Sequence, residues 1–213
     1  MNLQGVLYLL KLALTGDLRT VAYRARMKLR GIDLRSVTIT QLGLPPERCE
    51  QHANSGGPHL DVVCKTVSIT PADSVLDLGC GKGGAILTMV KYPFRRVDGV
   101  EISPQMARIA RENCRRMGIS NSEVFVADAA DFTLYDPYTF IYLYNPFPAR
   151  VMEQVLANLV LSVARAPRSV TLIYNNPVCD PLVRECGFVL QREFRNATLP
   201  VRVYGLSRTP QPH

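Results

Sequence analysis

Apolar runs alternate with amphipathic segments along residues 58–208, and this alternation predicts strands and helices in turn. Strands are expected at residues 74–78, 96–101, 122–127, 139–145, 168–174, 188–194 and 200–208. Helices are expected at residues 58–67, 84–91, 104–117, 148–165 and 179–186. Only the short segment RNATLP separates the last two strands, so these two must pair antiparallel. The predicted fold is α/β, with a doubly wound, mostly parallel seven-stranded sheet and a C-terminal antiparallel hairpin.

An N-terminal helical arm is expected before this alternation. One face of its first predicted helix consists of Leu3, Leu7, Leu10 and Leu14. Gly16 ends that helix and Asp17 can cap a second one. The apolar stripe of the second helix consists of Leu18, Val21, Ala22, Ala25 and Leu29. One interpretation is a helical hairpin packed on the domain, with its basic side chains in solvent.

The arm also carries most of the positive charge. Residues 1–35 hold seven basic and two acidic side chains, a surplus of five, which leaves only two of the net +7 for the other 178 residues. A second interpretation is therefore an amphipathic surface that meets anionic lipid or an acidic partner. Nucleic acid is a third, which the scarcity of aromatic residues in the arm disfavours. In each case residues 1–35 are expected to be dispensable for cofactor binding.

Length and composition limit the class of protein. A chain of 213 residues, 47% apolar and 20% charged, is expected to form one globular domain with a short appendage. Its six cysteines have no paired CxxC spacing, which argues against a zinc site and against a disulfide framework. No apolar run is long enough to span a membrane, so a cytoplasmic protein is expected. The expected parts are a basic arm at 1–35, a loop or linker at 36–57 and a cofactor-binding domain at 58–213.

A glycine-rich loop follows the first strand of this domain. The segment VLDLGCGKGG at 75–84 fits a dinucleotide-binding fingerprint, and Glu101 follows about 20 residues later. Asp77, however, ends the strand just before the first glycine, where a pyrophosphate would lie. Because a carboxylate repels phosphate and attracts an ammonium group, the ligand is expected to be cationic at one end.

The motif Asp77-x-Gly79-x-Gly81-x-Gly83 resembles the glycine loop of class I S-adenosylmethionine-dependent methyltransferases. The resemblance covers about residues 58–208 and implies S-adenosylmethionine as the cofactor. It also implies that Glu101, with Ile102 beside it, holds the ribose hydroxyls. Asp128, with Ala129 beside it, corresponds to the acid that meets the adenine amino group. The implied cofactor-binding residues are Asp77, Gly79, Cys80, Gly81, Gly83, Glu101, Ile102, Asp128, Ala129 and Asn145.

Two residues of the loop depart from that motif, and a flexible segment precedes it. Cys80 fills a position that needs only a small residue, so a structural role is expected. Lys82 is expected to point into solvent, because a positive charge near the sulfonium would oppose binding. His52 and Ser55 lie where relatives carry a segment that closes over the cofactor. A gating role and an ordinary loop are both open for them.

The fourth strand ends in Asn145-Pro146-Phe147-Pro148. This stretch resembles the Asn-Pro-Pro-aromatic signature of methyltransferases that act on planar amino groups, with the aromatic one place early. The resemblance implies that Asn145 offers its side-chain oxygen, Pro146 its carbonyl and Phe147 an aromatic face. The alternative is a strand ended by proline, with Asn145 as a helix cap. No His, Asp or Glu cluster has metal-ligand spacing, so no metal is expected.

Several functions fit these features. The first is an N-methyltransferase acting on a small molecule or a protein side chain. The alternatives are an O-methyltransferase acting on a glycan or lipid-linked intermediate, and a nucleic-acid base methyltransferase. The nearly neutral domain argues against the nucleic-acid alternative, which needs a basic track to the pocket. A non-catalytic, cofactor-binding partner subunit is a fourth reading, which the intact acidic and glycine positions disfavour.

Overall fold

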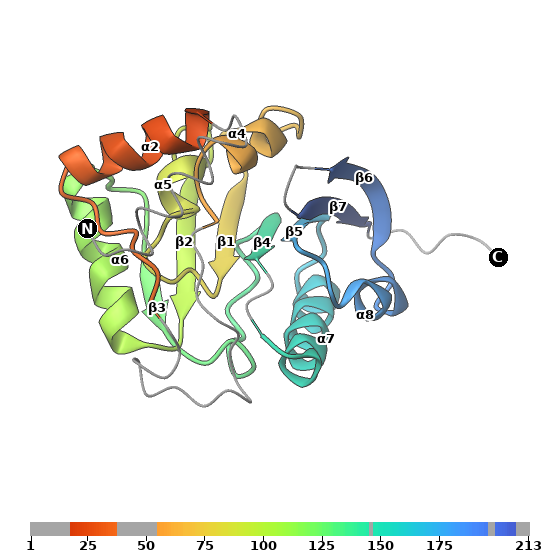
Figure 1. Cartoon of the computed structure of the whole chain (residues 1–213). Helices are drawn as coiled ribbons and strands as arrows, with labels where there is room; N and C mark the ends of the chain where they lie inside the picture. Colours follow the sequence, from red (N-terminus) through yellow and green to blue (C-terminus); the bar gives the residue numbers. More distant parts are fainter. Residues whose placement is uncertain (1–17, 38–54, 145–146, 196–198, 208–213) are drawn as a thin grey trace.

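The computed structural model describes residues 18–37, 55–144, 147–195 and 199–207. Their strands form one seven-stranded sheet in the order β3-β2-β1-β4-β5-β7-β6 (Figure 1). The strands are β1 (Ser74–Leu78), β2 (Arg96–Glu101), β3 (Val124–Val126), β4 (Phe140–Tyr144), β5 (Val170–Asn175), β6 (Val189–Arg195) and β7 (Pro200–Leu206). All neighbours pair parallel except β7, which is antiparallel to both β5 and β6. The predicted fold class is confirmed.

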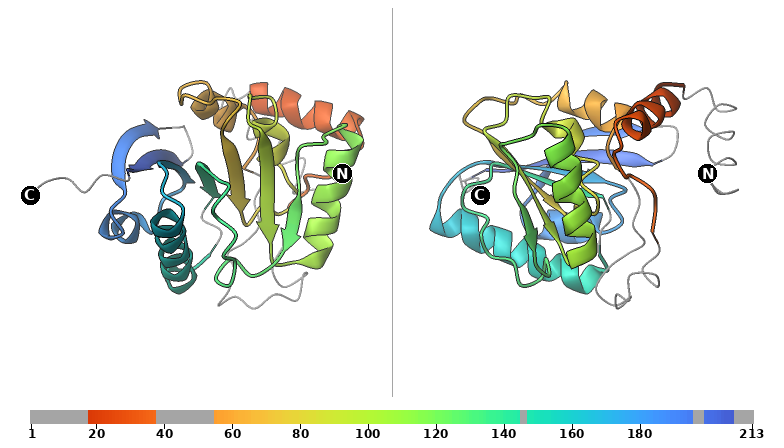
Figure 2. Two further views of the ribbon diagram at one scale, coloured as in Figure 1. Left: turned by 180° about the vertical axis from the view of Figure 1, so that it is seen from behind. Right: turned by 90° about the vertical axis from the view of Figure 1, so that its left-hand side faces the viewer.

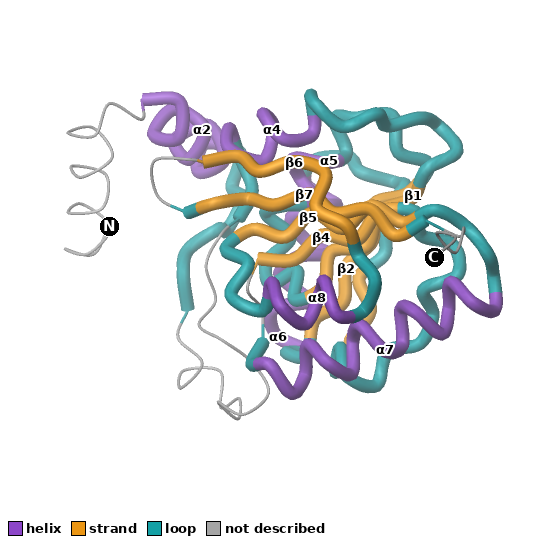
Figure 3. The backbone as a smooth tube through the Cα atoms, turned by 90° about the vertical axis from the view of Figure 1, so that its right-hand side faces the viewer, coloured by secondary structure: helices purple, strands orange, loops and turns teal. Residues whose placement is uncertain are grey.

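Helices cover both faces of this sheet (Figure 3). One face carries α2 (Leu18–Leu29), α4 (Pro58–Cys64), α5 (Ile86–Met89) and α6 (Pro104–Arg116). The other face carries α7 (Ala149–Arg165) and α8 (Asp180–Glu185). Each face has its own buried apolar cluster, because alternate residues of a strand point to opposite sides. In β4, for example, Tyr142 joins the cluster under α5, whereas Ile141 and Leu143 join the one under α7.

Helix α6 begins and ends where the sequence predicts. The Ser103 hydroxyl accepts a hydrogen bond from the Met106 N–H at 3.3 Å, and Pro104 occupies the first turn. Gly118, with φ of 69°, follows the last turn. The helix therefore presents Ala107 and Ala110 to the sheet from a fixed starting point.

Helix α2 packs on the domain by a different face from the one that its apolar stripe predicts. The buried residues of α2 are Thr20 and Met27, and Tyr23 packs beside them. Leu18 and Leu29 of the predicted stripe are 66% and 89% exposed. These two residues of the stripe therefore do not pack on the described part of the domain. The Tyr23 ring and the Met27 thioether fill more space against the domain than the alanines of the stripe would.

The two edges of the sheet differ from its interior. At one edge, β3 has only three residues. At the other, the pairing of β6 with β7 shifts register between Leu190 and Arg192, and most of β6 is exposed or half-buried. Glu193 of β6 forms ion pairs with Arg195 at 2.9 Å and with Arg202 of β7 at 2.7 Å.

None of the helices in the described part of the chain is both long and apolar enough to cross a membrane.

Figure 2 shows α2 and α4 on the side of the molecule away from α7.

Candidate functional site

The candidate site lies where the parallel strands end, at the edge to which the β1 and β2 arrows point in Figure 1. Strand β1 lies between β2 and β4, and Asp77 is in register with Gly99 on one side and Tyr142 on the other. Residues in register share a face, so the side chains of Asp77 and Tyr142 project from the same face of the sheet.

The loop after β1 turns sharply against the end of β2. The N–H groups of Gly79 and Cys80 both donate to the Val100 carbonyl, at 2.9 and 3.0 Å. Gly79, Gly81 and Gly83 have φ of 75°, 54° and 79°. Residues other than glycine rarely adopt this left-handed backbone conformation. The loop therefore presents bare backbone at the edge of the sheet, as a ligand that approaches it closely requires.

Cys80 is buried in the packing of this loop. A Cβ atom at Gly99 would lie 2.6 Å from the Cys80 sulfur, so the bare backbone of Gly99 leaves room for the thiol. Burial above all, with the nearby acids Asp77 and Glu101, raises the pKa of the thiol well above its usual value. Cys80 thus stays protonated and packs as a small apolar group, in line with the expected structural role.

Glu101 joins the end of β2 to the glycine loop. Its carboxylate accepts hydrogen bonds from the N–H of Gly81 at 2.8 Å and from the N–H of Ser103 at 2.9 Å. Burial raises the pKa of Glu101, and these backbone hydrogen bonds partly offset that effect. An ionised carboxylate offers about four acceptor sites, so this group can still accept hydrogen bonds from a ligand.

Asp77, in contrast to Glu101, has a carboxylate oxygen without a hydrogen-bond donor among the described residues. It is 2% exposed, and its Oδ2 atom is buried with no hydrogen-bond partner among the described residues. Burial, reinforced by the negative charge of Glu101, raises the pKa of Asp77 well above its usual value. A buried carboxylate that lacks a donor is unfavourable in the free protein, and a ligand with an ammonium group would relieve it.

Tyr142 and Asn175 join the site, although the sequence analysis did not select them. The Tyr142 hydroxyl donates to the Ser55 carbonyl at 3.4 Å, and Asn175 Nδ2 donates to the same hydroxyl at 3.4 Å. Burial raises the pKa of Tyr142, so it stays a neutral phenol. The sequence signal for Tyr142 was a tyrosine hydroxyl inside the apolar run FIYLY. That signal indicates a site residue only once the register of Tyr142 with Asp77 is known.

The next strand along the edge carries the second acid of the resemblance. Asp128 is half-buried two residues beyond the end of β3, and its Oδ1 accepts from the Ala130 N–H at 2.9 Å. Ala129 is buried and Ile102 is half-buried. Asp77 lies one residue before the end of β1, Glu101 at the end of β2 and Asp128 two residues after the end of β3. Because these three strands are adjacent and parallel, the three acids lie at the same end of the strands.

Lys82 does not point into solvent, and the expectation that it does is wrong. Its side chain is 3% exposed, and its Nζ lies 3.0 Å from Oδ2 of Asp33. Asn113 of α6 strengthens this link, because its Nδ2 donates to the carbonyls of both Lys82 and Asp33. Burial raises the pKa of Asp33, but hydrogen bonds from Arg35 and Lys82 outweigh it, and the net pKa is well below the usual range. The arm thus neutralises the cation of the glycine loop.

Residues 55–57 also lie directly against the glycine loop. A Cβ atom at Gly56 would lie 1.9 Å from the Gly84 carbonyl oxygen, so only glycine fits there. The Gly57 N–H donates to the Thr88 hydroxyl at 2.8 Å, and a Cβ atom on Gly57 would lie 2.9 Å from the Tyr23 ring. This contact places the end of the predicted linker between α2 and the loop. His52 lies outside the described residues, and a lid role for it or Ser55 stays a prediction.

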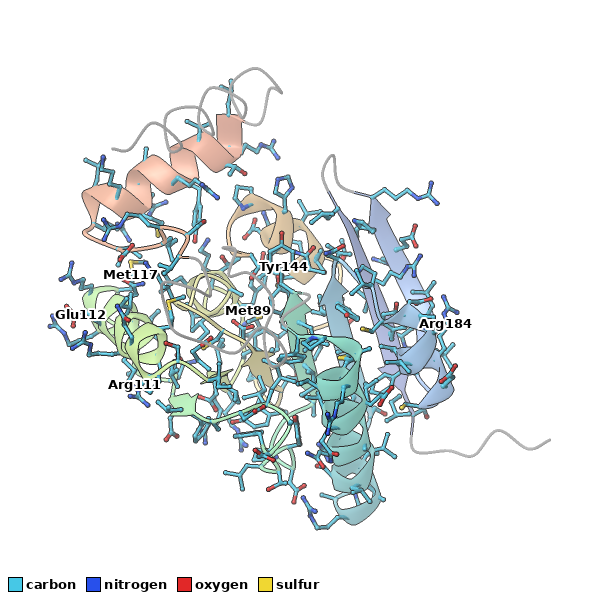
Figure 4. All side chains as sticks on the ribbon, turned by 60° about the horizontal axis from the view of Figure 1, so that its bottom comes forward. Met89, Arg111, Glu112, Met117, Tyr144 and Arg184 are labelled. Atoms are coloured by element: carbon cyan, nitrogen blue, oxygen red, sulfur yellow. The ribbon has the colours of Figure 1, made fainter. Side chains whose placement is uncertain are left out.

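The predicted acceptor residues lie at the end of β4. Strand β4 ends at Tyr144, which Figure 4 labels, and Asn145 and Pro146 lie outside the described residues. Phe147 is 6% exposed and belongs to the apolar cluster under α7. Its ring contributes to that core, and its catalytic role stays a prediction.

Residues 75–166 match a family described as a methyltransferase domain. This chain contains a class I S-adenosylmethionine-dependent methyltransferase domain. The cofactor of that class is S-adenosylmethionine, whose amino group suits the unpartnered carboxylate of Asp77. The matched residues include the glycine loop, Glu101 and Asp128.

Two curated relatives show how local the sequence similarity is. (S)-coclaurine N-methyltransferase of Thalictrum flavum subsp. glaucum is 36% identical over 80 residues, which are 37% of this chain and 22% of that protein. Release factor glutamine methyltransferase of Vibrio cholerae is 37% identical over 68 residues, 28% of this chain and 24% of that protein. The matches thus span less than a quarter of the length of these relatives.

A solved structure extends the likeness over the fold. An RNA methyltransferase from Salinibacter ruber, in complex with S-adenosyl-L-homocysteine, superposes with a TM-score of 0.57 at 17% identity. The superposition covers 73% of this chain and 95% of that one. At this level of identity the likeness supports the fold of the methyltransferase domain alone.

Proposed function

We propose that this protein transfers a methyl group from S-adenosylmethionine to a nitrogen atom of a small molecule or a protein side chain. The observation that carries the proposal is the segment Asn145-Pro146-Phe147-Pro148, which follows β4 directly. Because β4 pairs with β1, the strand that precedes this segment lies next to the strand that carries Asp77. In the same proposal, residues 1–35 form a basic arm, 36–57 a loop or linker and 58–213 the methyltransferase domain.

Three acids would hold the cofactor. Asp77 would accept hydrogen bonds from its ammonium group, which supplies the donor that Oδ2 lacks. The carboxylate of Glu101, with Ile102 beside it, would accept hydrogen bonds from the ribose hydroxyls. The carboxylate of Asp128, with Ala129 beside it, would accept one from the adenine amino group. The backbone of Gly79, Gly81 and Gly83 leaves room for close approach. When bound, S-adenosylmethionine supplies a methyl group already activated by its positive sulfur.

Asn145 and Pro146 would orient the acceptor. The side-chain oxygen of Asn145 and the carbonyl of Pro146 can accept both hydrogens of an NH₂ group, which aims the nitrogen lone pair. The lone pair would form the new N–CH₃ bond as the S–CH₃ bond breaks and its electron pair passes to sulfur, and the methylated nitrogen would then release a proton to solvent. Positioning of this kind suffices for a donor that is already activated. The names of two relatives, (S)-coclaurine N-methyltransferase and release factor glutamine methyltransferase, favour a nitrogen acceptor.

The test measures single-turnover methyl transfer to a panel of amines, glutamine peptides, hydroxyl compounds and nucleic acids. We expect transfer to a nitrogen acceptor, and we expect Asn145→Ala to slow it about 10²-fold, the scale for one preorganised polar group at a reacting centre. Affinity for S-adenosylmethionine should be nearly unchanged. Asn145→Asp should also be impaired on an amide or aromatic amine, but should retain activity on an alkyl ammonium acceptor.

Asn121→Ala provides the matched control. Asn121 precedes β3, so it lies at the N-terminal ends of the parallel strands, opposite to the site. There its Nδ2 donates to the Phe94 carbonyl at 3.3 Å. This variant should transfer methyl at the wild-type rate. Transfer to oxygen alone, or an unchanged rate in Asn145→Ala, would overturn the nitrogen-acceptor proposal. Cofactor binding without transfer to any acceptor would support a non-catalytic subunit instead.

A further inference from the structure

We propose that the outward face of α2, formed by Leu18, Ala22, Ala25 and Leu29, binds to the surface of an anionic lipid bilayer. These four residues are exposed and lie at helical spacing, so they form one stripe along the helix. The proposal concerns where the protein acts. It goes beyond methyl transfer and does not depend on the identity of the acceptor.

The helix holds this face outward by anchoring the opposite one. Met27 is buried in the core cluster, and Tyr23 packs against Gly57 and lies under the Lys91 ammonium, 5.7 Å from the ring centroid. Leu18 and Leu29 are therefore presented to solvent by a fixed scaffold, at 66% and 89% exposure. A single exposed leucine is ordinary in a folded protein, but apolar residues aligned on one helix face mark an interaction surface.

The residues on either side of the stripe are basic, which indicates an anionic partner. Arg19, Arg26, Lys28 and Arg30 are all exposed, and residues 18–32 contain no acid. Among the described residues, no ion pair satisfies Arg19, Arg26 or Lys28. An apolar stripe with basic flanks matches a membrane interface, where acyl chains meet the leucines and anionic headgroups meet the cations.

Helix α6 extends the basic surface. The Arg116 guanidinium donates to the Gly31 carbonyl, and Arg30 Nη1 lies 3.6 Å from the Met117 sulfur, so the C-terminal ends of α2 and α6 adjoin. Figure 4 shows α2 beside that end of α6, where Met117 and Glu112 are labelled. Helix α6 contains only one acid, Glu112, which forms ion pairs with Arg115 and Arg116. Its four exposed arginines are Arg108, Arg111, Arg115 and Arg116.

Two other occupants of this face must be distinguished from lipid. The chain before α2 holds Leu3, Leu7, Leu10 and Leu14 at helical spacing, and a segment of this kind could cover the stripe. A second copy of the chain could pack there as well. Either occupant would account for the apolar residues. Neither occupant accounts for the basic residues on both sides of the stripe, which have no acidic residue opposite them. Two copies packed through this face would bring these positive charges together, and the charges would repel each other.

The test is sedimentation of the full-length protein with phosphatidylcholine vesicles that contain or lack phosphatidylserine, at low and high salt. We expect binding that needs the anionic lipid and weakens as salt screens the charges. Arg19→Gln combined with Arg26→Gln should weaken binding roughly 30-fold, since each basic residue near such a surface contributes about 1 kcal/mol. Leu29→Glu should weaken it by about 10-fold or more.

Leu161→Glu is the matched control, because Leu161 is 62% exposed on α7, across the sheet from α2. It should bind vesicles like the wild type, and Leu29→Glu should keep the wild-type melting temperature. Protein that stays in the supernatant under every condition would overturn the proposal. A lower melting temperature in Leu29→Glu without vesicle binding would place residues 1–17 on this face. A dimer that Leu29→Glu dissociates would place a second copy there.

Discussion

Two buried aspartates on neighbouring strands differ in how the protein satisfies them. Asp98 of β2 is 0% exposed and accepts hydrogen bonds from Arg96 at 2.6 Å, the Tyr138 hydroxyl at 2.8 Å and the Glu123 N–H at 2.7 Å. Asp77 of β1 is almost equally buried, yet its Oδ2 has no partner among the described residues. Both are aspartates near the middle of the sheet, so neither residue type nor burial distinguishes them.

The difference separates a structural acid from a ligand-binding acid. Asp98 projects to the α7 face, where Tyr138 closes over it, and its partners come from the protein itself. Asp77 projects to the opposite face, beside the glycine loop, where its missing partner can come from outside. Burying an unpaired carboxylate destabilises a fold, so its presence at a strand end is best explained by a ligand that completes it.

The largest expected effect is on cofactor affinity in Asp77→Asn. The amide keeps the size of the side chain but loses its charge, so hydrogen bonds worth about 1.5–3 kcal/mol each weaken or vanish. We expect affinity for S-adenosylmethionine to fall roughly 100-fold or more by titration calorimetry. The melting temperature of the free protein should not fall, because Oδ2 of Asp77 has no hydrogen-bond partner to lose among the described residues. Unchanged affinity would remove Asp77 from the site.

Asp98→Asn should show the reverse pattern. An amide cannot accept from Arg96, Tyr138 and Glu123 together without placing its own N–H₂ group against a donor. We expect the free energy of unfolding to fall by about 2 kcal/mol, the scale for an unsatisfied buried polar group, in a urea titration. Affinity for S-adenosylmethionine should remain that of the wild type. A large loss of affinity at preserved stability would contradict the structural assignment of Asp98.

The raised pKa of Asp77 makes cofactor binding depend on pH. The free protein holds a proton on Asp77 up to a pH above the usual value for an aspartate, whereas the ammonium of the cofactor favours the ionised form. Affinity should therefore fall by up to about tenfold per pH unit as pH drops below the pKa of Asp77, and level off above it. The stability of the free protein changes in the opposite direction. Because the folded pKa is raised, stability decreases as pH rises from the usual value through the folded pKa.

Calorimetry across a pH series, in buffers with different enthalpies of ionisation, measures this proton release. Asp77→Asn is the control, because it removes the titrating group and should flatten the low-pH slope. A wild-type affinity that does not change with pH, or a slope that persists in the variant, would assign the effect to another group.

The smallest effect is expected for Asp33→Asn. This substitution leaves Lys82 buried without its counter-charge. An uncompensated positive charge in the glycine loop would oppose the binding of a cationic cofactor. Asp33 is partly exposed, and water can screen the loss. We expect affinity for S-adenosylmethionine to weaken by roughly fivefold, which is about 1 kcal/mol, and Asp33→Glu to restore part of it.

Asp136→Asn is the comparison for that measurement. Asp136 forms an ion pair with Arg165 at 2.7 Å, away from the glycine loop, and this substitution should leave affinity unchanged. Equal affinity in Asp33→Asn and the wild type would instead support the expectation from the charge distribution that residues 1–35 are dispensable for cofactor binding.

The sequence predicts the strands well because each apolar run is bounded by turn residues. The segment VLDLG, for example, gives β1 at its observed bounds, and the glycines after it predict the loop. The order of Asp77, Glu101 and Asp128 along the site edge follows from the fold class. Local pattern is sufficient for these features, since each depends on residues close together in the chain.

The errors concern contacts between distant residues. Lys82 pairs with Asp33, 49 positions earlier, and nothing near Lys82 in the sequence indicates a buried partner. The packing face of α2 depends on a fit between Tyr23 and Gly57, which hydrophobic periodicity does not encode. Tyr142 gains its place in the site only through its register with Asp77. Tertiary packing decides each of these, and periodicity predicts none of them.

The edges of the sheet bear on how the protein behaves when it is crowded. An open sheet can recruit strands from other molecules along its unpaired edges, which leads to aggregation. Here one edge strand, β3, is only three residues long, and the other, β6, carries a register shift and the charged residues Arg192, Glu193 and Arg195. Within the described residues, the sheet therefore offers a neighbouring chain no long, flat, uncharged edge strand for pairing. We expect the folded protein to stay dispersed at high concentration.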